Sequence, residues 1–313
     1  MPPTTKHITV LTPCFNEEGN VRELHERIAT AFAACPGYTY DHLYIDNAST
    51  DGTVTQLRLL AAVDPSVRVI LNNRNFGHVR SPYHGLLQGR GDAVIVMASA
   101  LQDPPELICD FIRLWKEGHE VVLGQKVQSE ESSFFFAGRR AYYRLLRRLS
   151  DVDLQENTTG FGLYSRKVIE DLRELDEPYP YLRGLVSDLG YSIARVPYTQ
   201  PLRQRGLTKN NFYTLYDVAM LGITSHSKVP LRFATMLGFA MSALSFAVGL
   251  VYLVYKLLYW ERFALGVAPV VIGLFFFASV QLFFIGIVGE YIGAIHTRVT
   301  RRPLVIERER INF

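Results

Sequence analysis

Cysteine is scarce in this sequence, which has three in 313 residues. Cys14, Cys35 and Cys109 are odd in number, widely separated and match no spacing of metal ligands. The sequence therefore predicts neither a disulfide framework nor a zinc site, and a reducing, cytosolic environment is the default. The N-terminal residues contain no long apolar run behind a basic start, so we expect no signal peptide.

A strong excess of one charge is also missing. The formal net charge is +3, whereas binding to nucleic acid needs a concentrated basic face, so we expect no nucleic-acid partner. The phosphate loop G-x-x-x-x-G-K-[ST] and the G-x-G-x-x-G turn do not follow any candidate strand, which excludes the usual fingerprints of NTP and NAD binding. A nucleotide ligand has to be held in another way.

The first two thirds of the chain alternate between two hydrophobic patterns. Short apolar runs rich in β-branched residues predict strands over 7–12, 40–46, 67–71, 93–97 and 120–124. Helical periodicity lies between most of them, over 18–34, 51–63, 79–88 and 105–115. This alternation predicts an α/β fold with a mostly parallel, Rossmann-like sheet that helices cover on both faces.

Two long uncharged runs follow Pro230, over 233–255 and 263–289, and each is long enough to cross a bilayer as a helix. The short connection KLLYWER forces them into an antiparallel transmembrane hairpin, so both flanks lie on one side. Basic residues dominate these flanks, which places them in the cytoplasm; they are Lys228, Arg232, Arg298, Arg301 and Arg302. The alternative, a pair of buried helices in a soluble core, is disfavoured by the length of the runs.

Two further segments are typical of helices that lie on a membrane surface. Residues 134–150 combine aromatic residues and leucines with several arginines, and residues 210–228 form a second amphipathic segment before the hairpin. For 134–150 a solvated basic face on an ordinary helix remains an alternative. On a membrane, its arginines would face lipid phosphates.

Polar residues directly follow the predicted strands, where ligands bind in this architecture. Pro13, Asn16 and Glu17 come after the first strand, Asp46 ends the second, and Arg74 and Gly77 follow the third. Turn and capping chemistry is the alternative for each group; Ser49 or Thr50, for example, is placed to cap the next helix. Their common position favours a ligand site.

Several motifs in this chain resemble, in order, those of one enzyme family; they are TPCFNEEGNV, IDNASTDGT, NRNFG, ALQDPPE, TGFGLYSRKVIE, RQRGLTK and a C-terminal VPLR followed by GEYIG. The family is that of the family-2, GT-A fold polyisoprenyl-phosphate glycosyltransferases. It includes relatives of dolichol-phosphate mannose synthase and of bacterial enzymes that make undecaprenyl-phosphate glucose. The resemblance covers essentially the whole chain. Processive polysaccharide synthases share the soluble fold, but the Q-x-x-R-W motif expected of them is absent.

The resemblance implies roles for residues that bind the nucleotide-sugar donor. Pro13, Asn16 and Asp46 match positions that hold the nucleoside, and Asn47 replaces the second aspartate of the usual pair. Arg203 and Lys209 match an R-x-x-G-x-[ST]-K pattern whose arginine reaches the donor diphosphate.

The resemblance also implies an acceptor site for a polyprenyl phosphate. Lys126 matches a basic residue that holds the acceptor phosphate, and Arg139 with Tyr143 matches an Arg/Ser pair for the same group. Tyr143 in place of serine departs from that pattern.

The family's metal motif D-x-D-x-Q falls on Ala98, Ala100 and Gln102, followed by Asp103. Mg²⁺ or Mn²⁺, the expected cofactor, prefers oxygen ligands, and two methyl groups cannot ligate it. Three accounts of Ala100 remain open. In the first, this chain is a mutated form of a relative that has aspartate at position 100, made to trap the donor without turnover. In the second, it is a natural enzyme that uses Gln102, Asp103 and the phosphates of the substrate. In the third, it is a natural pseudoenzyme that binds donor or lipid.

These observations divide the chain into a GT-A domain over 1–209, an amphipathic segment over 210–228, a hairpin over 229–292 and a cytosolic tail over 293–313. We expect a homo-oligomer in the cytoplasmic membrane, with the catalytic domain and both termini in the cytosol. The predicted reaction is inverting transfer of a hexose to undecaprenyl phosphate. The NTTGFGLYSRKV pattern resembles the bacterial undecaprenyl-phosphate glucosyltransferases more than the mannose synthases, and this resemblance implies UDP-glucose as donor, with GDP-mannose as the alternative. A membrane-anchored binding module is the non-enzymatic alternative.

Overall fold

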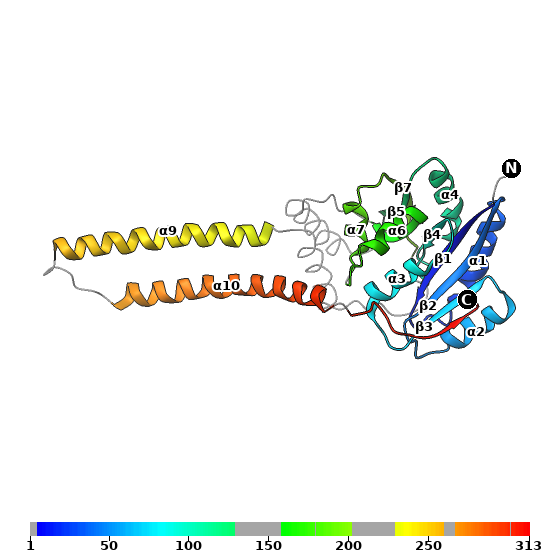
Figure 1. Cartoon of the computed structure of the whole chain (residues 1–313), viewed down its shortest axis with the longest axis horizontal. Helices are drawn as coiled ribbons and strands as arrows, with labels where there is room; N and C mark the ends of the chain where they lie inside the picture. Colours follow the sequence, from blue (N-terminus) through cyan, green and yellow to red (C-terminus); the bar gives the residue numbers. More distant parts are fainter. Residues whose placement is uncertain (1–4, 129–157, 179, 202–228, 260–266, 301) are drawn as a thin grey trace.

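An α/β domain and a long helical hairpin make up the computed structural model, which describes residues 5–128, 158–178, 180–201, 229–259, 267–300 and 302–313. The hairpin extends away from the domain, and the C-terminal segment returns to it (Figure 1). The GT-A-like α/β architecture with two long C-terminal helices confirms the predicted fold class.

The domain is built on one sheet with the strand order β7-β5-β6-β4-β1-β2-β3-β8. Parallel pairs join β1 to β2 and β4, β2 to β3, and β5 to β7, whereas β6 and β8 pair antiparallel with their neighbours. The strands are β1 (Lys6–Cys14), β2 (Tyr38–Asp46), β3 (Val67–Asn72), β4 (Ala93–Val96), β5 (Val121–Gln128), β6 (Thr158–Ser165), β7 (Ile193–Thr199) and β8 (Glu307–Ile311).

Helices cover both faces of this sheet because alternate strand residues point to opposite sides. Along β3, Val69 and Leu71 pack on one face, while Ile70 packs on the other. The first face is covered by α1 (Val21–Ala33), α2 (Thr53–Val63) and α4 (Ile108–Lys116), which follows the short helix η1 (Pro105–Leu107). The second is covered by α3 (Gly77–Gln88), α6 (Arg166–Glu174) and α7 (Leu182–Asp188).

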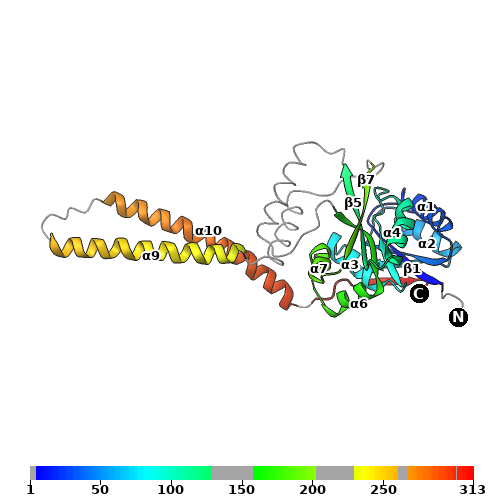
Figure 2. The same ribbon diagram turned by 90° about the horizontal axis from the view of Figure 1, so that it is seen from above.

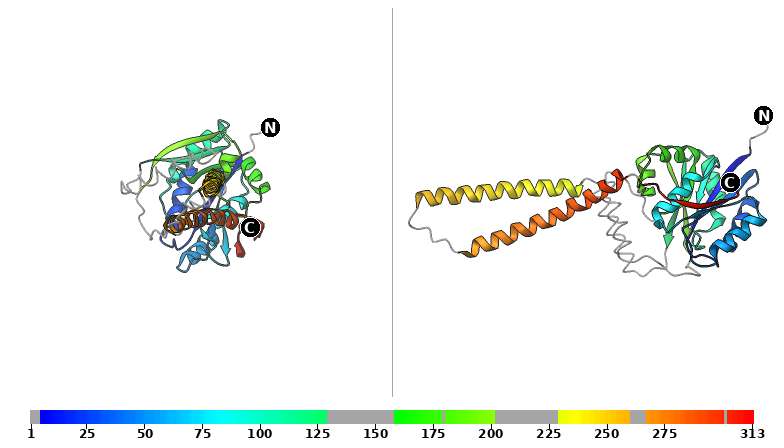
Figure 3. Two further views of the ribbon diagram at one scale, coloured as in Figure 1. Left: turned by 90° about the vertical axis from the view of Figure 1, so that its left-hand side faces the viewer. Right: turned by 60° about the horizontal axis from the view of Figure 1, so that its bottom comes forward.

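Strand β8 lies in the segment 293–313, for which a cytosolic tail was predicted. It lies antiparallel on the edge of β3, with Val69 opposite Ile311. The Arg58 guanidinium donates to Glu309 at 2.9 Å, and the Asn312 amide donates to the carbonyl oxygens of Ala61 and Val67 at 2.7 and 2.9 Å. The C-terminal segment therefore completes the sheet, along the domain edge seen in Figure 3.

The hairpin consists of α9 (Val229–Leu258) and α10 (Val267–Val299). Two stretches, Leu231–Val251 and Phe276–His296, are long and apolar enough to cross a membrane, and neither is buried inside the protein. The helices run side by side in opposite directions (Figure 2). Because the domain precedes α9 and β8 follows α10, both ends of the hairpin lead back to the same domain.

A disulfide joins Cys35, just after α1, to Cys109 in α4, with their Cα atoms 5.8 Å apart. The expectation of no disulfide was therefore wrong. The two residues are 74 positions apart in the chain, and only the packing of α4 beside α1 brings them together. Cys14 is the free cysteine and is buried.

Some predicted local features differ from the structure. Ser49 does not cap α2, because its backbone N–H and hydroxyl donate to Asp46. Asp51 instead accepts from the backbone N–H of Thr53 at the start of that helix. The predicted surface helices over 134–150 and 210–228 lie outside the described residues.

A pair of stacked histidines connects α1 to β2. His42 is fully buried, its Nε2 lies 3.0 Å from the Thr12 hydroxyl, and its Nδ1 lies 3.3 Å from Nδ1 of His25. His25 in turn lies 3.3 Å from Asp64. Burial, together with His25, holds the pKa of His42 well below its usual range.

This depressed pKa predicts a loss of stability on acidification. Below about pH 6.5 the unfolded chain binds a proton that the folded His42 does not. Unfolding free energy should therefore fall by about 1.4 kcal/mol for each pH unit below that value, until the folded pKa is reached. Thermal unfolding of the full chain in detergent, compared with His42→Asn between pH 7.5 and 5, tests this. Equal pH slopes in the two proteins would contradict it.

Candidate active site

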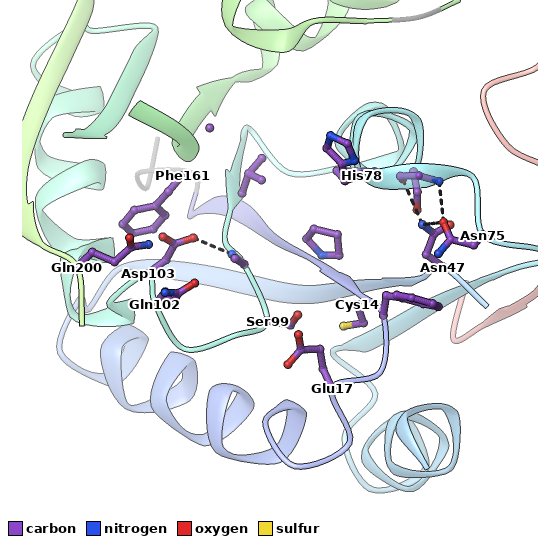
Figure 4. Close-up of a pocket in the computed structure, with 18 of the residues that line it drawn as sticks. Cys14, Glu17, Asn47, Asn75, His78, Ser99, Gln102, Asp103, Phe161 and Gln200 are labelled. Carbon is purple, nitrogen blue, oxygen red and sulfur yellow. Dashed lines mark hydrogen bonds between the residues drawn. The ribbon is translucent and has the colours of Figure 1, made fainter. Parts of the chain in front are cut away.

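A cavity of about 640 Å³ opens at the carboxyl ends of β1, β2 and β4. This is where ligands bind in open α/β sheets, and the volume suits a small organic ligand. Figure 4 shows polar side chains from several elements converging on it. The lining residues are Pro13, Cys14, Phe15, Glu17, Asn47, Asn75, Gly77, His78, Ser81, Pro82, Val96, Ala98, Ser99, Gln102, Asp103, Lys126, Gly160, Phe161 and Gln200.

The structure brings many of the predicted site residues together in this lining. From the donor set these are Pro13, Glu17, Asn47 and Gly77. From the metal motif they are Ala98, Gln102 and Asp103, and from the acceptor set Lys126.

Other predicted residues lie outside the lining. Asn16 exchanges hydrogen bonds with Thr50, and Arg74 is exposed, with its guanidinium over the Phe76 ring. Asp46 is fully buried and accepts two hydrogen bonds from Ser49. Ala100 is 9% exposed. Arg139, Tyr143, Arg203 and Lys209 lie outside the described residues.

Several lining residues were not among the predicted ones. Asn75 and His78 belong to the NRNFGH stretch, of which only Arg74 and Gly77 were predicted as site residues; the position of this stretch after a strand was the available signal. Phe161 lies in β6, and Gln200 directly follows β7. The motif TGFGLYSRKVIE, which contains Phe161, was the signal for that residue, whereas no quoted motif contains Gln200.

The segment after β4 turns sharply instead of staying extended. Leu101 has φ +56°, an unusual value for a residue with a side chain, and is held there with its side chain buried. The turn directs Asp103 back into the cavity, where its carboxylate accepts from the Ala98 N–H at 2.9 Å and from the Tyr198 hydroxyl at 3.2 Å.

These groups do not fit a divalent cation. The side chains of Ala98 and Ala100 offer no donor atom, which leaves Asp103 as the one carboxylate of this motif, and each of its oxygens accepts one hydrogen bond within the protein. Gln102 contributes one neutral carbonyl. Among the described residues, no group of three or more His, Cys, Asp or Glu side chains is arranged to hold a metal.

Burial dominates the electrostatics of the cavity floor. It raises the pKa of Asp103, against the opposing effects of the Ala98 N–H, the Lys126 charge and the Tyr198 hydroxyl. Burial also raises the pKa of the Cys14 thiol well above its usual range, and the nearby Asp46 and Glu17 carboxylates add to that shift. Cys14 is therefore an inert thiol near neutral pH.

The sheet and its crevice define a GT-A-like α/β protein, and comparison with known proteins defines it further. The model of glycosyl transferase family 2 matches residues 9–173, and that of the GtrB C-terminal hairpin matches residues 229–295. The chain therefore belongs to glycosyl transferase family 2 and is a glycosyltransferase that carries a GtrB-type hairpin.

Two relatives match nearly the full length of both chains. An uncharacterized glycosyltransferase of Bacillus subtilis, YkcC, is 33% identical over 96% of this chain and 94% of its own. The bactoprenol glucosyl transferase of Shigella phage SfII is 32% identical over 96% of each. Among solved structures, a Pyrobaculum calidifontis mannosyltransferase in complex with GDP-Man and Mn²⁺ matches 95% of this chain and 88% of its own, at 15% identity and a TM-score of 0.47.

Proposed function

We propose that this chain transfers glucose from UDP-glucose to undecaprenyl phosphate, with inversion, at the cytosolic face of the membrane. The observation that carries the proposal is the joining of a donor-sized crevice to a membrane hairpin in one chain. A water-soluble donor and a membrane-embedded acceptor need both. The full-length similarity to bactoprenol glucosyl transferases supports the acceptor class and the sugar.

The return of the chain to the sheet supports the proposed orientation. With α9 and α10 across the bilayer, β8 can pair with β3 only if both ends of the hairpin emerge on the side of the α/β domain. Basic residues at those ends, Arg232, Arg298 and Arg302 among them, favour the cytosol. We expect the hairpin to act as an anchor and to associate into a homo-oligomer.

The reaction needs positioning and charge more than a strong base. A polyprenyl phosphate is largely ionised near neutral pH, because its second pKa is about 6 by analogy with other phosphoesters. Its oxygen can therefore attack the anomeric carbon in line while the nucleoside diphosphate leaves from the opposite side. Among the described residues that line the cavity, Lys126 carries the positive charge. We propose that its ammonium group binds the acceptor phosphate.

We propose that turnover in this chain is impaired at the corner formed by Ala98, Ala100 and Asp103. At this corner the leaving diphosphate meets a single carboxylate, Asp103, and among the described residues no group of three or more His, Cys, Asp or Glu side chains is arranged to hold a cation that would neutralise the developing charge. This arrangement supports an inactivated or donor-trapping site over one in which Asp103 replaces the missing aspartate.

Donor binding tests the proposed function. Titration of the full chain in detergent with UDP-glucose, UDP-N-acetylglucosamine and GDP-mannose, followed by thermal unfolding, should show stabilisation by UDP-glucose above the others. Stronger stabilisation by GDP-mannose would replace the donor with that of a mannose synthase. Stabilisation by no nucleotide sugar, with or without Mg²⁺ or Mn²⁺, would overturn the proposal.

A further inference from the structure

Asn47 uses its whole hydrogen-bonding capacity on a single loop of the cavity wall. Its Oδ1 accepts from the Phe76 N–H at 2.9 Å and from the Asn72 amide at 3.2 Å. Its Nδ2 donates to Oδ1 of Asn75 at 2.9 Å and to the Gly77 carbonyl at 3.1 Å. An asparagine amide has two donor hydrogens and two acceptor lone pairs, so none remains for a ligand.

The loop that Asn47 holds, residues 72–77, forms one wall of the cavity. Asn75 and Gly77 line it, and His78 follows at the start of α3. Gly77 has φ +85°, a conformation that favours glycine, and its N–H donates to Oδ1 of Asn75 at 2.8 Å. Figure 4 shows Asn47 and Asn75 joined in this way at the edge of the cavity.

Aspartate, which has nearly the same shape, cannot make these contacts. A carboxylate has no N–H, so one of its oxygens would face both Oδ1 of Asn75 and the Gly77 carbonyl, and neither can donate. Rotation of the Asn75 amide would repair only the contact between positions 47 and 75, because it would turn the Asn75 NH₂ group towards the Gly77 N–H, and the contact with the Gly77 carbonyl would remain unfavourable. The loop in its present shape therefore requires asparagine at position 47.

We propose that Asn47 is a positioning residue that fixes the 72–77 loop and thereby sets the affinity for the donor, whose contacts are made by the loop and not by the Asn47 side chain. This inference rests on the proposed function, since it assumes that the cavity holds a nucleotide sugar. The inference goes beyond the proposed function because it assigns a role to the asparagine that replaces the family's second aspartate at position 47: it holds the 72–77 loop.

The test is Asn47→Asp, with Asn73→Asp as the matched control. Asn73 lies in the same loop but is exposed and outside the lining, so the control adds the same charge without breaking the amide contacts. Calorimetry at pH 7.5 should show the Kd for UDP-glucose raised about ten- to a hundredfold in Asn47→Asp, as two hydrogen bonds are lost and two oxygen contacts become repulsive. The control should stay within about twofold.

Two additional readouts separate positioning from general damage. Acidification should partly restore donor affinity in Asn47→Asp, because a protonated carboxyl regains one donor, and it should not do so in the control. Hydrogen exchange at the Phe76 and Gly77 amides should be faster in Asn47→Asp, with exchange in β1 unchanged. If Asn47→Asp fails to fold, Asn72→Ala removes one contact of Asn47 from a buried position outside the lining and should raise both the Kd and the loop exchange.

The outcomes distinguish this inference from the proposed function. Unchanged donor affinity in a folded Asn47→Asp protein would overturn the inference and leave the function standing. Unchanged exchange in the loop would do the same even if the starting chain bound no donor. Absence of donor binding by the starting chain would overturn the proposed function and, with it, the link from the loop to the donor.

Discussion

Ala100→Asp is expected to raise transfer to a polyprenyl phosphate by about a hundred- to a thousandfold, and to make it dependent on added Mg²⁺ or Mn²⁺. The physical reason is that the leaving diphosphate gains negative charge, which a cation can neutralise. In the present corner both oxygens of Asp103 serve the Ala98 N–H and the Tyr198 hydroxyl. A carboxylate at position 100 would add a second acidic group to this corner beside Asp103.

The control for this prediction is Ala100→Asn, which adds nearly the same volume without charge. Initial rates with labelled UDP-glucose and a short polyprenyl phosphate, with and without a chelator, measure the effect. An unchanged rate in Ala100→Asp would contradict the hypothesis that this chain is impaired because it lacks an aspartate at position 100.

Asp103→Asn decides whether a second account holds, in which Asp103 itself supports catalysis. The asparagine can keep both contacts, with its oxygen accepting from the Ala98 N–H and its amide donating to the Tyr198 oxygen. The loop should therefore stay in place while the charge is removed. We expect the residual transfer by the starting chain to change by less than about threefold, since a lone carboxylate without a second acidic ligand holds a cation poorly and contributes little to stabilising the leaving diphosphate. Complete loss of that transfer would favour the second account.

The sequence predicted the first half of the sheet well, because its strands have strong periodic signals. The predicted runs over 7–12, 40–46, 67–71, 93–97 and 120–124 correspond to β1 through β5. Each is a short segment rich in apolar and β-branched residues, as expected for strands buried on both faces. The hairpin was equally clear from its length and lack of charge.

The strands β6, β7 and β8 were not predicted, and for β6 and β8 the physical reasons differ. In β6 the pattern is interrupted by Gly160 and Gly162, and a side chain at Gly162 would lie 2.3 Å from the Val122 carbonyl oxygen, so glycine marks a close backbone approach. Strand β8 has the sequence ERERI, which resembles a solvated charge run. Charged residues are common on an edge strand, where they discourage pairing with other chains.

The predicted site residues remain predictions as to their roles, but many of them share one cavity. The strand-end argument named Pro13, Glu17 and Gly77, and the family resemblance named Asn47, Gln102 and Asp103; all six line the cavity, since the carboxyl ends of parallel strands share one edge of the sheet. The sequence could not show that Leu101 turns the chain, or that Asn47 is fully engaged by the next loop. Both depend on contacts between residues distant in sequence, as does the disulfide of Cys35 with Cys109.

Lys126→Ala is expected to lower transfer about a hundredfold, mainly through a raised KM for the polyprenyl phosphate. Lys126 lies in β5 and lines the cavity. Its charge opposes the burial that raises the pKa of Asp103. Its loss would remove a cation from the side of the cavity where we place the acceptor phosphate. Measurement in the Ala100→Asp background keeps the rate detectable, and Lys126→Arg, which retains the charge, should keep most of the activity.

A double variant separates this role from a structural one. If Lys126 serves only to balance the buried Asp103 carboxylate, removing both charges in Lys126→Ala with Asp103→Asn should restore transfer to the level of Asp103→Asn alone. If Lys126 holds the acceptor phosphate, the double variant should remain as impaired as Lys126→Ala, with the KM for the donor unchanged in both. The coupling between the two substitutions therefore tells whether the Lys126 charge is directed at the protein or at the substrate.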